Sequence, residues 1–494
     1  MTSARSGPTR PVGSLSSEKA IDISASESSP QIEPKVELPG PEIENEAPRE
    51  LERWNESRTN IFRYLVTLYT FIAMGMSDAS YGALIPYLET YYQVSYTVVS
   101  LPYLAPFVGY TISAILNNKL HMRWGQRGVA IIAPICKLIA FIVTCTHPPF
   151  PVIPVIWVFI GFGTGLEDGA WNAWVGNMAN ANELLGFLHG AYGLGATIGP
   201  LIATTMVTKG VYPWYYFYYL MVAVGSLEVL LTNTAFYGAT GAVHRAAHPV
   251  THGDDGVQEN SRTRAALKNP ITWICALFLL CYVGVEVSFG GWLVTFMLRV
   301  RHGGAFESGL VVTFFWLGLT IGRVVLGFVT GRIGEKIAIA SYIVLSIILE
   351  LCFWLIPSFL SSAVLAAFMG FFLGPLFPAA IVVATKLLPP RLHVSAIGFS
   401  AAFGGGGAAL FPFAVGAIAS AKGVQVLQPI ALALLALILF FWVLLPGGFT
   451  KAGLERVRQD REDREAGRVP SERVVERTAV GRAIGKARTK LGIE

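Results

Sequence analysis

Acidic side chains inside long apolar stretches are the residues of this sequence best placed to do chemistry. Asp78, Glu286 and the adjacent pair Glu167 and Asp168 each interrupt a run of apolar residues. A charge at the centre of a membrane-spanning helix costs about 2.5–3.5 kcal/mol or more, so each one needs a physical reason to be there. A carboxyl group in such a place can bind a solute or carry a proton. The alternative is a carboxylate held in a static hydrogen-bond network.

Asp78 and Glu286 are separated by 208 positions, close to the spacing at which other features of the sequence repeat. The two residues would therefore occupy equivalent positions near the middle of two related helices. We predict that both bind substrate and that Asp78 also takes part in proton coupling.

Glu167 and Asp168 are neighbours, so on a helix their side chains point about 100° apart and only one can face a cavity squarely. Asn172 and the tryptophans Trp171 and Trp292 lie near the acidic positions. Carboxylates and amides bind hydroxyl groups, and aromatic rings cover apolar faces, so this combination suits a sugar or polyol. We predict substrate contacts from Asn172, Trp171 and Trp292. A purely structural role is the alternative for the tryptophans.

Other polar residues in apolar runs suggest structural roles. Lys137 could pair with a helix carboxylate or extend towards the membrane surface, whereas Glu228 and Glu350 are expected to join buried networks. His189 is expected to be a packing residue, with a proton relay as the alternative. The sequence has no clustered metal ligands and no nucleophile triad, and its five cysteines all lie in apolar runs, so we predict no metal and no cofactor.

The composition explains why these elements must lie in a membrane. Of 494 residues only 14% are charged, against about 25% in a soluble domain, and the mean hydropathy is +0.53. Spans of about 20 apolar residues can cross a bilayer. We predict twelve such helices at 61–88, 96–117, 128–147, 151–177, 184–208, 212–238, 271–298, 306–328, 335–357, 360–387, 393–420 and 424–446.

The charged segments divide the chain and orient it. We expect a disordered tail at 1–60, six helices within 61–238, a polar central loop at 239–270, six helices within 271–446 and a charged tail at 447–494. Loop lysines and arginines gather on the side of the two tails, which predicts cytoplasmic termini and, we expect, a plasma-membrane location. The net charge of +5 reflects these loops, so the predicted partner is a lipid bilayer and no nucleic acid.

Two loops and several glycines recur at a nearly constant spacing. The pattern Arg123-x-Gly125-x-Arg127 returns 209 positions later as Arg332-x-Gly334-x-Lys336. Matching pairs also include Gly161 with Gly370, Gly165 with Gly374 and Gly195 with Gly407. A repeat of this kind predicts an all-α membrane protein built from two pseudo-symmetric six-helix bundles.

The repeated loops resemble the G-x-L-x-D-R-x-G-R-K element of the major facilitator superfamily, although Met122 and Gly331 replace its Asp. The resemblance implies that the chain is a transporter and that these loops form its conformational gate. The predicted gate residues are Arg123, Gly125, Arg127, Arg323, Arg332, Gly334 and Lys336. A Gly-Pro element ending at Pro200 resembles the antiporter motif, but Trp157 stands where drug exporters have Arg.

Within the superfamily the chain is most similar to the fucose:proton symporters. The likeness covers about 61–446 and rests on the segment from Cys281 to Glu286 with Trp292, on Ile321-Gly-Arg323, and on the run from Gly165 to Asn172. It implies a protonatable acid four residues before Asn172, which is Asp168, with Glu167 as the alternative. Asp78 lies one turn before the position of the family's first-helix carboxylate.

We therefore expect a secondary transporter that works by alternating access and moves a small polar organic solute, a sugar or polyol, together with protons. The first alternative is a proton-coupled efflux antiporter for an organic metabolite or drug. The second is a membrane enzyme or a receptor that does not transport.

Overall fold

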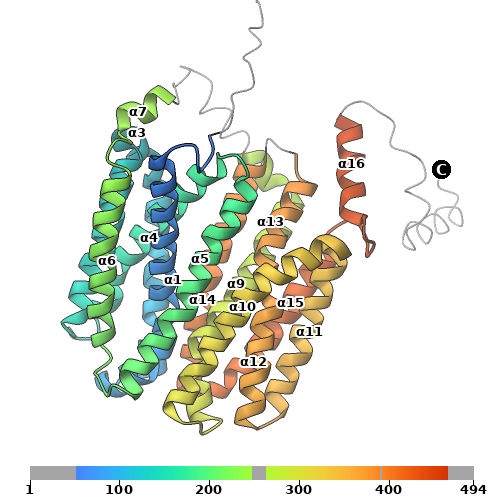
Figure 1. Ribbon diagram of the computed structural model, residues 1–494. Coiled ribbons are helices and arrows are strands. Elements are labelled where there is room, and N and C mark those ends of the chain that lie inside the picture. The colour runs from blue at the N-terminus through green and yellow to red at the C-terminus, as the bar shows by residue number, and fades with distance from the viewer. Residues whose placement is uncertain (1–51, 248–262, 390–391, 466–494) are drawn as a thin grey trace, which may run out of the picture. The chain divides into compact units, whose positions relative to one another are not determined.

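The computed structural model describes residues 52–247, 263–389 and 392–465. Most of the predicted tails at 1–60 and 447–494, and the middle of the predicted loop at 239–270, lie outside these residues. The part from Leu51 onwards forms one compact unit. In the described residues the regular structure is helical (Figure 1).

The first half of the chain contains seven described helices. The first begins three residues before the predicted span, because Ser57 caps it by accepting a hydrogen bond from the Asn60 N–H. The helices are α1 (Arg58–Tyr92), α2 (Tyr96–Val99), α3 (Leu101–Cys145), α4 (Val152–Gly176), α5 (Ala181–Thr208), α6 (Tyr216–Ala235) and α7 (Gly241–Ala247).

The second half has the same order of long helices. Its sixth predicted span is preceded by one turn of 3-10 helix, and its fourth is divided at Gly374–Pro375 into two helices. The elements are α9 (Pro270–Arg299), α10 (Ala305–Ile333), α11 (Glu335–Leu355), α12 (Phe359–Leu373), α13 (Leu376–Leu387), α14 (His393–Lys422), η2 (Val424–Val426), α15 (Leu427–Leu444) and α16 (Gly453–Glu465).

All twelve predicted spans lie on helices. Ten of the described helical segments are long and apolar enough to cross a membrane. One of them contains α3, which breaks sharply at Gly125 (φ +69°), so that it carries two predicted spans. The long helix α1 is not among these ten segments, because Asp78 and several small polar residues lower its mean hydropathy. The fold is an all-α membrane protein, as predicted.

Glycines set the contacts between helices in both halves. A Cβ atom at Gly161 would lie 1.9 Å from the carbonyl oxygen of Pro106, and one at Gly370 would lie 2.2 Å from that of Phe315. Since Pro106 and Phe315 are also 209 positions apart, the α3–α4 contact is repeated as the α10–α12 contact. Without side chains at these glycines the backbones can touch, which is how membrane helices pack most closely.

A second contact repeats in the same way. Gly195 of α5 lies against the carbonyl of Ile72 in α1, and Gly407 of α14 lies against the carbonyl of Leu280 in α9. The duplication inferred from the sequence is therefore a duplication of helix contacts.

The bundle has two end faces, which the course of its helices distinguishes. We call the terminal face the end at which α1 begins and α15 ends, and the opposite face the end at which α1 ends and α2 begins. In Figure 1 the short helix α7 marks the terminal face.

Candidate functional site

A cavity of about 340 Å³ lies between helices of the two halves. Its wall combines aromatic rings with five ionisable side chains, and these come from five helices: α1, α4, α5, α9 and α10. The ionisable residues are Asp78, Asp168, His189, Glu286 and Arg323. The aromatic residues are Phe71, Tyr81, Tyr103, Phe107, Tyr110, Trp157, Tyr192 and Phe377.

Asp168 lies on the cavity wall and accepts two hydrogen bonds. The Tyr110 hydroxyl of α3 donates to its Oδ2 over 2.5 Å, and the Asn172 amide donates to its Oδ1 over 2.8 Å. Because each carboxylate oxygen receives a donor, the arrangement fits a deprotonated Asp168.

Asp78 and Glu286 line the same cavity, as their equivalent positions suggested. Asp78 is exposed to the cavity and its Oδ2 lies 3.3 Å from the donating Tyr192 hydroxyl of α5. Glu286 is buried and its Oε1 lies 3.5 Å from an Arg323 Nη2. At this pair of equivalent positions, the first half therefore supplies the exposed carboxylate of Asp78, and the second supplies the ion pair of Glu286 with Arg323.

Arg323 was predicted to belong to the gate loops, and the structure corrects this. Helix α10 continues to Ile333, so Arg323 lies ten residues, or about 15 Å, from its end. The guanidinium contacts Glu286 and donates to the Gly374 carbonyl over 3.2 Å, which fixes it at the cavity wall.

Trp171 and Trp292, predicted to contact the substrate, are buried and do not line the cavity in this conformation. Trp171 is fully buried and stacks on Phe236 with ring centroids 4.3 Å apart. Trp292 is fully buried near the opposite face, where its indole N–H donates to the Pro412 carbonyl over 2.9 Å. Both tryptophans hold helices together.

Glu167 and Asn172 also lie off the cavity wall. Glu167 is fully buried and forms an ion pair with Lys137, so it is not the cavity-facing member of the acidic pair. Asn172 reaches the site only through its hydrogen bond to Asp168. Its position makes it an orienting residue for that carboxylate.

The two halves meet between the cavity and the opposite face. Thr97 of α2 and Ser420 of α14 lie 2.8 Å apart at their hydroxyl groups, and a Cβ atom at Gly82 would lie 2.7 Å from the Gly290 carbonyl oxygen. Towards the terminal face, by contrast, Gly190 of α5 and Gly398 of α14 have no atom within 4 Å of a Cβ position. We infer that this conformation is closed at the opposite face and open towards the terminal face.

The predicted gate loops lie at the terminal face and share one construction. Gly125 (φ +69°) lies against the backbone of Ala239 and Thr240, and Gly334 (φ +100°) lies against the backbone of Lys451. In each half, the chain that follows the sixth helix therefore crosses the loop glycine. Only glycine adopts these φ values without strain.

The basic gate residues differ in their surroundings. The buried ammonium of Lys336 donates to the carbonyls of Trp442 and Leu445 at the end of α15. The guanidinium of Arg127 lies 4.2 Å from the Tyr237 ring centre, and that of Arg123 lies 5.0 Å from the ring of Trp124. Arg332 is exposed.

The sequence reasoning missed three residues of the site. Tyr110 and Tyr192 hold the two aspartates, but a tyrosine in an apolar span has many uses and neither stands out by type. His189 was expected to pack, and it does lie 5.7 Å from the Phe71 ring, yet it also lines the cavity. That His189 lines the same cavity as the aspartates and Arg323 follows only from the arrangement of the helices.

Comparisons with known proteins agree with this fold. A family model of the Major Facilitator Superfamily matches residues 66–361 and 294–488. The chain belongs to the major facilitator superfamily, and it is an integral, multi-pass membrane protein of a class that transports small molecules and is generally not enzymatic.

Two relatives and one solved structure show the range of similar proteins. Bypass of stop codon protein 6 of Saccharomyces cerevisiae is 30% identical over 408 residues, which are 77% of this chain and 82% of that protein. The glucose/mannose transporter GlcP of Bacillus subtilis is 24% identical over 72% of this chain and 87% of its own. A crystal structure of the nucleoside transporter NupG matches with a TM-score of 0.63 and 14% identity, covering 78% of this chain and 99% of that one, which supports the fold.

Proposed function

We propose that the protein is a proton-coupled symporter of a sugar or a similar small polyhydroxy solute, as in the fucose:proton symporters. The observation that carries the proposal is Asp168, a carboxylate that accepts two side-chain hydrogen bonds and shares one cavity with the exposed carboxylate of Asp78 and the Glu286–Arg323 pair. A protonatable group and several hydroxyl-binding groups thus share one space.

The cavity suits one small polar molecule. Its volume of about 340 Å³ lies at the lower end of the range for ligand sites, about 300–1,000 Å³. Tyr81, Trp157 and Phe377 offer apolar surface, whereas Asp78 and Arg323 offer an acceptor and a donor. GlcP, named as a glucose/mannose transporter, supports a sugar over other solutes.

The proton would be carried by Asp168. In this conformation both of its oxygens receive donors, which suits the carboxylate form after a proton has left. When Asp168 takes up a proton, one of its oxygens becomes a donor, so the Tyr110 hydroxyl, which donates to it in this conformation, would have to accept instead or leave. Protonation would thereby weaken the side-chain link between α3 and α4 and favour the other conformation.

The direction follows from the orientation that we propose, with both termini in the cytoplasm of a plasma-membrane protein. The terminal face is then cytoplasmic, and this conformation is open inward with its proton released. Solute and proton would leave together into the cytoplasm, which is uptake by symport.

Reconstituted vesicles provide the test. A panel of monosaccharides, polyols and nucleosides is offered with and without an imposed pH gradient. The proposal predicts that a sugar or polyol accumulates above equilibrium only with the gradient. Accumulation of a solute opposite to the proton movement would support the efflux antiporter, and gradient-independent equilibration would exclude proton coupling.

A further inference from the structure

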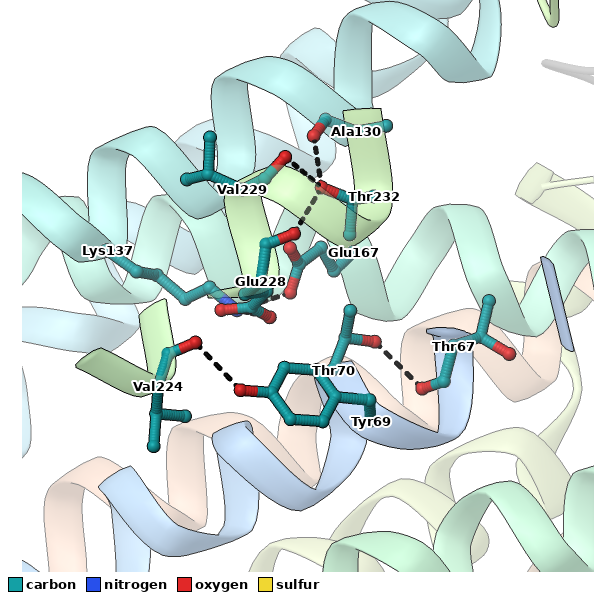
Figure 2. A network of polar contacts seen from close by, with 10 residues as sticks. All are labelled: Thr67, Tyr69, Thr70, Ala130, Lys137, Glu167, Val224, Glu228, Val229 and Thr232. Atoms are coloured by element: carbon teal, nitrogen blue, oxygen red, sulfur yellow. Dashed lines mark hydrogen bonds and ion pairs between the residues drawn. The ribbon is translucent and has the colours of Figure 1, made fainter. Parts of the chain in front are cut away.

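A buried charged cluster lies in the first half, behind the cavity wall. The ammonium nitrogen of Lys137 in α3 lies 2.5 Å from Glu167 Oε2 in α4 and 2.7 Å from Glu228 Oε1 in α6. The three side chains are between 0% and 3% exposed. Figure 2 shows the lysine side chain reaching the two glutamates. None of the three residues lines the cavity.

Two carboxyl oxygens of the cluster have no hydrogen bond, and one additional proton shared between them would supply it. Glu167 Oε1 and Glu228 Oε2 are buried and receive no hydrogen bond from the described residues. Both carboxyl groups contact the same ammonium nitrogen, at 2.5 and 2.7 Å, so they lie close to each other. Because ionised carboxylates only accept, two of them cannot bond to each other unless one carries a proton.

The charges lead to the same requirement. Two ionised glutamates and one lysine would leave a net charge of −1 at a site without water contact. An uncompensated buried charge is strongly destabilising, whereas one added proton makes the cluster neutral. Both glutamates pair with the same lysine, and among the described residues neither glutamate has an ion pair with a second cation that would offset the excess.

The neighbouring groups do not supply the missing donor. Tyr69 of α1 donates to the Val224 carbonyl over 2.8 Å, and Thr232 of α6 donates to the carbonyls of Ala130 and Glu228 (Figure 2). The other ionisable groups nearby are Asp168, which is adjacent to Glu167 on α4, and Asp78 on α1, on which the charge of Lys137 acts. Both are acidic, so they oppose a further negative charge.

We propose that Glu167 and Glu228 share one proton, which makes this cluster a proton-binding site separate from Asp168. The proton replaces the missing donor and neutralises the excess charge. With the cluster neutral, Asp168 can ionise without a second negative charge at the adjacent residue. The inference concerns the resting protein and does not depend on which solute is transported or on whether transport is coupled to protons.

Infrared spectroscopy of the full-length purified protein at neutral pH tests the proposal, because a protonated carboxyl group has its own C=O stretching band. Glu228→Gln and Glu167→Gln each leave Lys137 with one ionised partner. Both variants should therefore lose one protonated-carboxyl band relative to the wild type.

Glu350→Gln is the matched control, since Glu350 is also fully buried but lies on α11 in the second half. Adding Glu228→Gln to the Glu350→Gln variant should remove the same amount of protonated-carboxyl band as Glu228→Gln removes from the wild type. If either Glu167→Gln or Glu228→Gln keeps the full wild-type band, the cluster holds no shared proton and the proposal is overturned.

Lys137→Met gives an independent measurement if a glutamine variant does not fold. Without the cation, both glutamates must be neutral, so the cluster should take up a second proton and gain one protonated-carboxyl band. An unchanged band in folded Lys137→Met would overturn the proposal.

Discussion

The two halves of the chain repeat the same helix contacts but differ in their buried charge. Gly161 and Gly370 touch equivalent carbonyls, and Gly125 and Gly334 form equivalent turns. The position equivalent to Lys137, 209 residues later, is Ser346, which donates to the Tyr342 carbonyl within its own helix. The position equivalent to Glu167 is the buried Leu376.

The comparison teaches that backbone geometry and ion chemistry are separable in this fold. Glycines at close backbone contacts cannot change without moving a helix, so both halves keep them. Buried charges can be lost where a partner is lost with them. In the first half, α4 carries two acidic residues, Asp168 at the cavity and Glu167 in the cluster with Lys137. The second half instead contributes the Glu286–Arg323 pair.

The largest expected effect is loss of coupling in the first half. Asp168→Asn keeps the shape of the side chain but removes the proton carrier, so uphill accumulation driven by a pH gradient should be abolished. Exchange of substrate at equal pH should remain. Transport in vesicles measures both, with Glu307→Gln, an exposed acid at the start of α10, as the control. Uphill accumulation by Asp168→Asn would move the proton site elsewhere.

The second prediction tests what the halves share. Leucine at Gly125 and Gly334 would add a strain of about 1–2 kcal/mol at each positive φ and would meet backbone at 2.4–2.5 Å. Transport by the folded double variant should slow by roughly 10-fold or more. Gly331→Leu is the matched control, because its Cβ would meet no atom within 4 Å. An unchanged rate in the double variant would mean that the loops no longer gate transport.

The third prediction compares the equivalent carboxylates directly. Glu286→Gln and Asp78→Asn should each weaken substrate binding by about 1.5–3 kcal/mol, the worth of a charge-assisted hydrogen bond. That is roughly 10- to 150-fold in affinity. If one substrate bridges both residues, the double variant should lose less than the sum. Equilibrium binding at fixed pH measures this, and wild-type affinity in both single variants would remove them from the site.

The smallest expected effect concerns a feature of the second half, the contact of α16 with the terminal face. Lys386 pairs with Glu335 over 2.7 Å and with Glu455 over 3.5 Å, and all three side chains are partly exposed. Lys386→Gln should therefore cost less than about 1 kcal/mol and lower Tm only slightly. A large fall in Tm would show that α16 is a main support of this half.

The sequence was sufficient for the helices, the repeat and the cavity position of Asp78, Asp168 and Glu286. The acidic residues stand out because a charge is costly in an apolar span. The repeat stands out because the glycines at equivalent helix contacts recur at a nearly constant spacing. Helix register explains an error. Residues four apart share a helix face, so Asp168 and Asn172, whose side chains hydrogen-bond to each other, lie on one face of α4, and Glu167 and Trp171 lie together on a neighbouring face that is buried.

The remaining parts of the site depend on distances between helices. Tyr110 and Tyr192 contact their aspartates across pairs of helices, and Arg323 of α10 contacts Glu286 of α9. No spacing within one helix determines these contacts. The Lys137 pairing with α4 could be anticipated as an alternative, but the second glutamate comes from α6, 91 residues away.

The central claim, symport of a solute with a proton through Asp168, is tested most directly by substrate-driven proton flux. Vesicles that contain a pH-sensitive dye receive the identified substrate without an imposed pH gradient. The proposal predicts that substrate entering through wild-type protein acidifies the vesicle interior and that Asp168→Asn transports without acidification. Substrate entry with no acidification, or with proton movement in the opposite direction, in the wild type would contradict it.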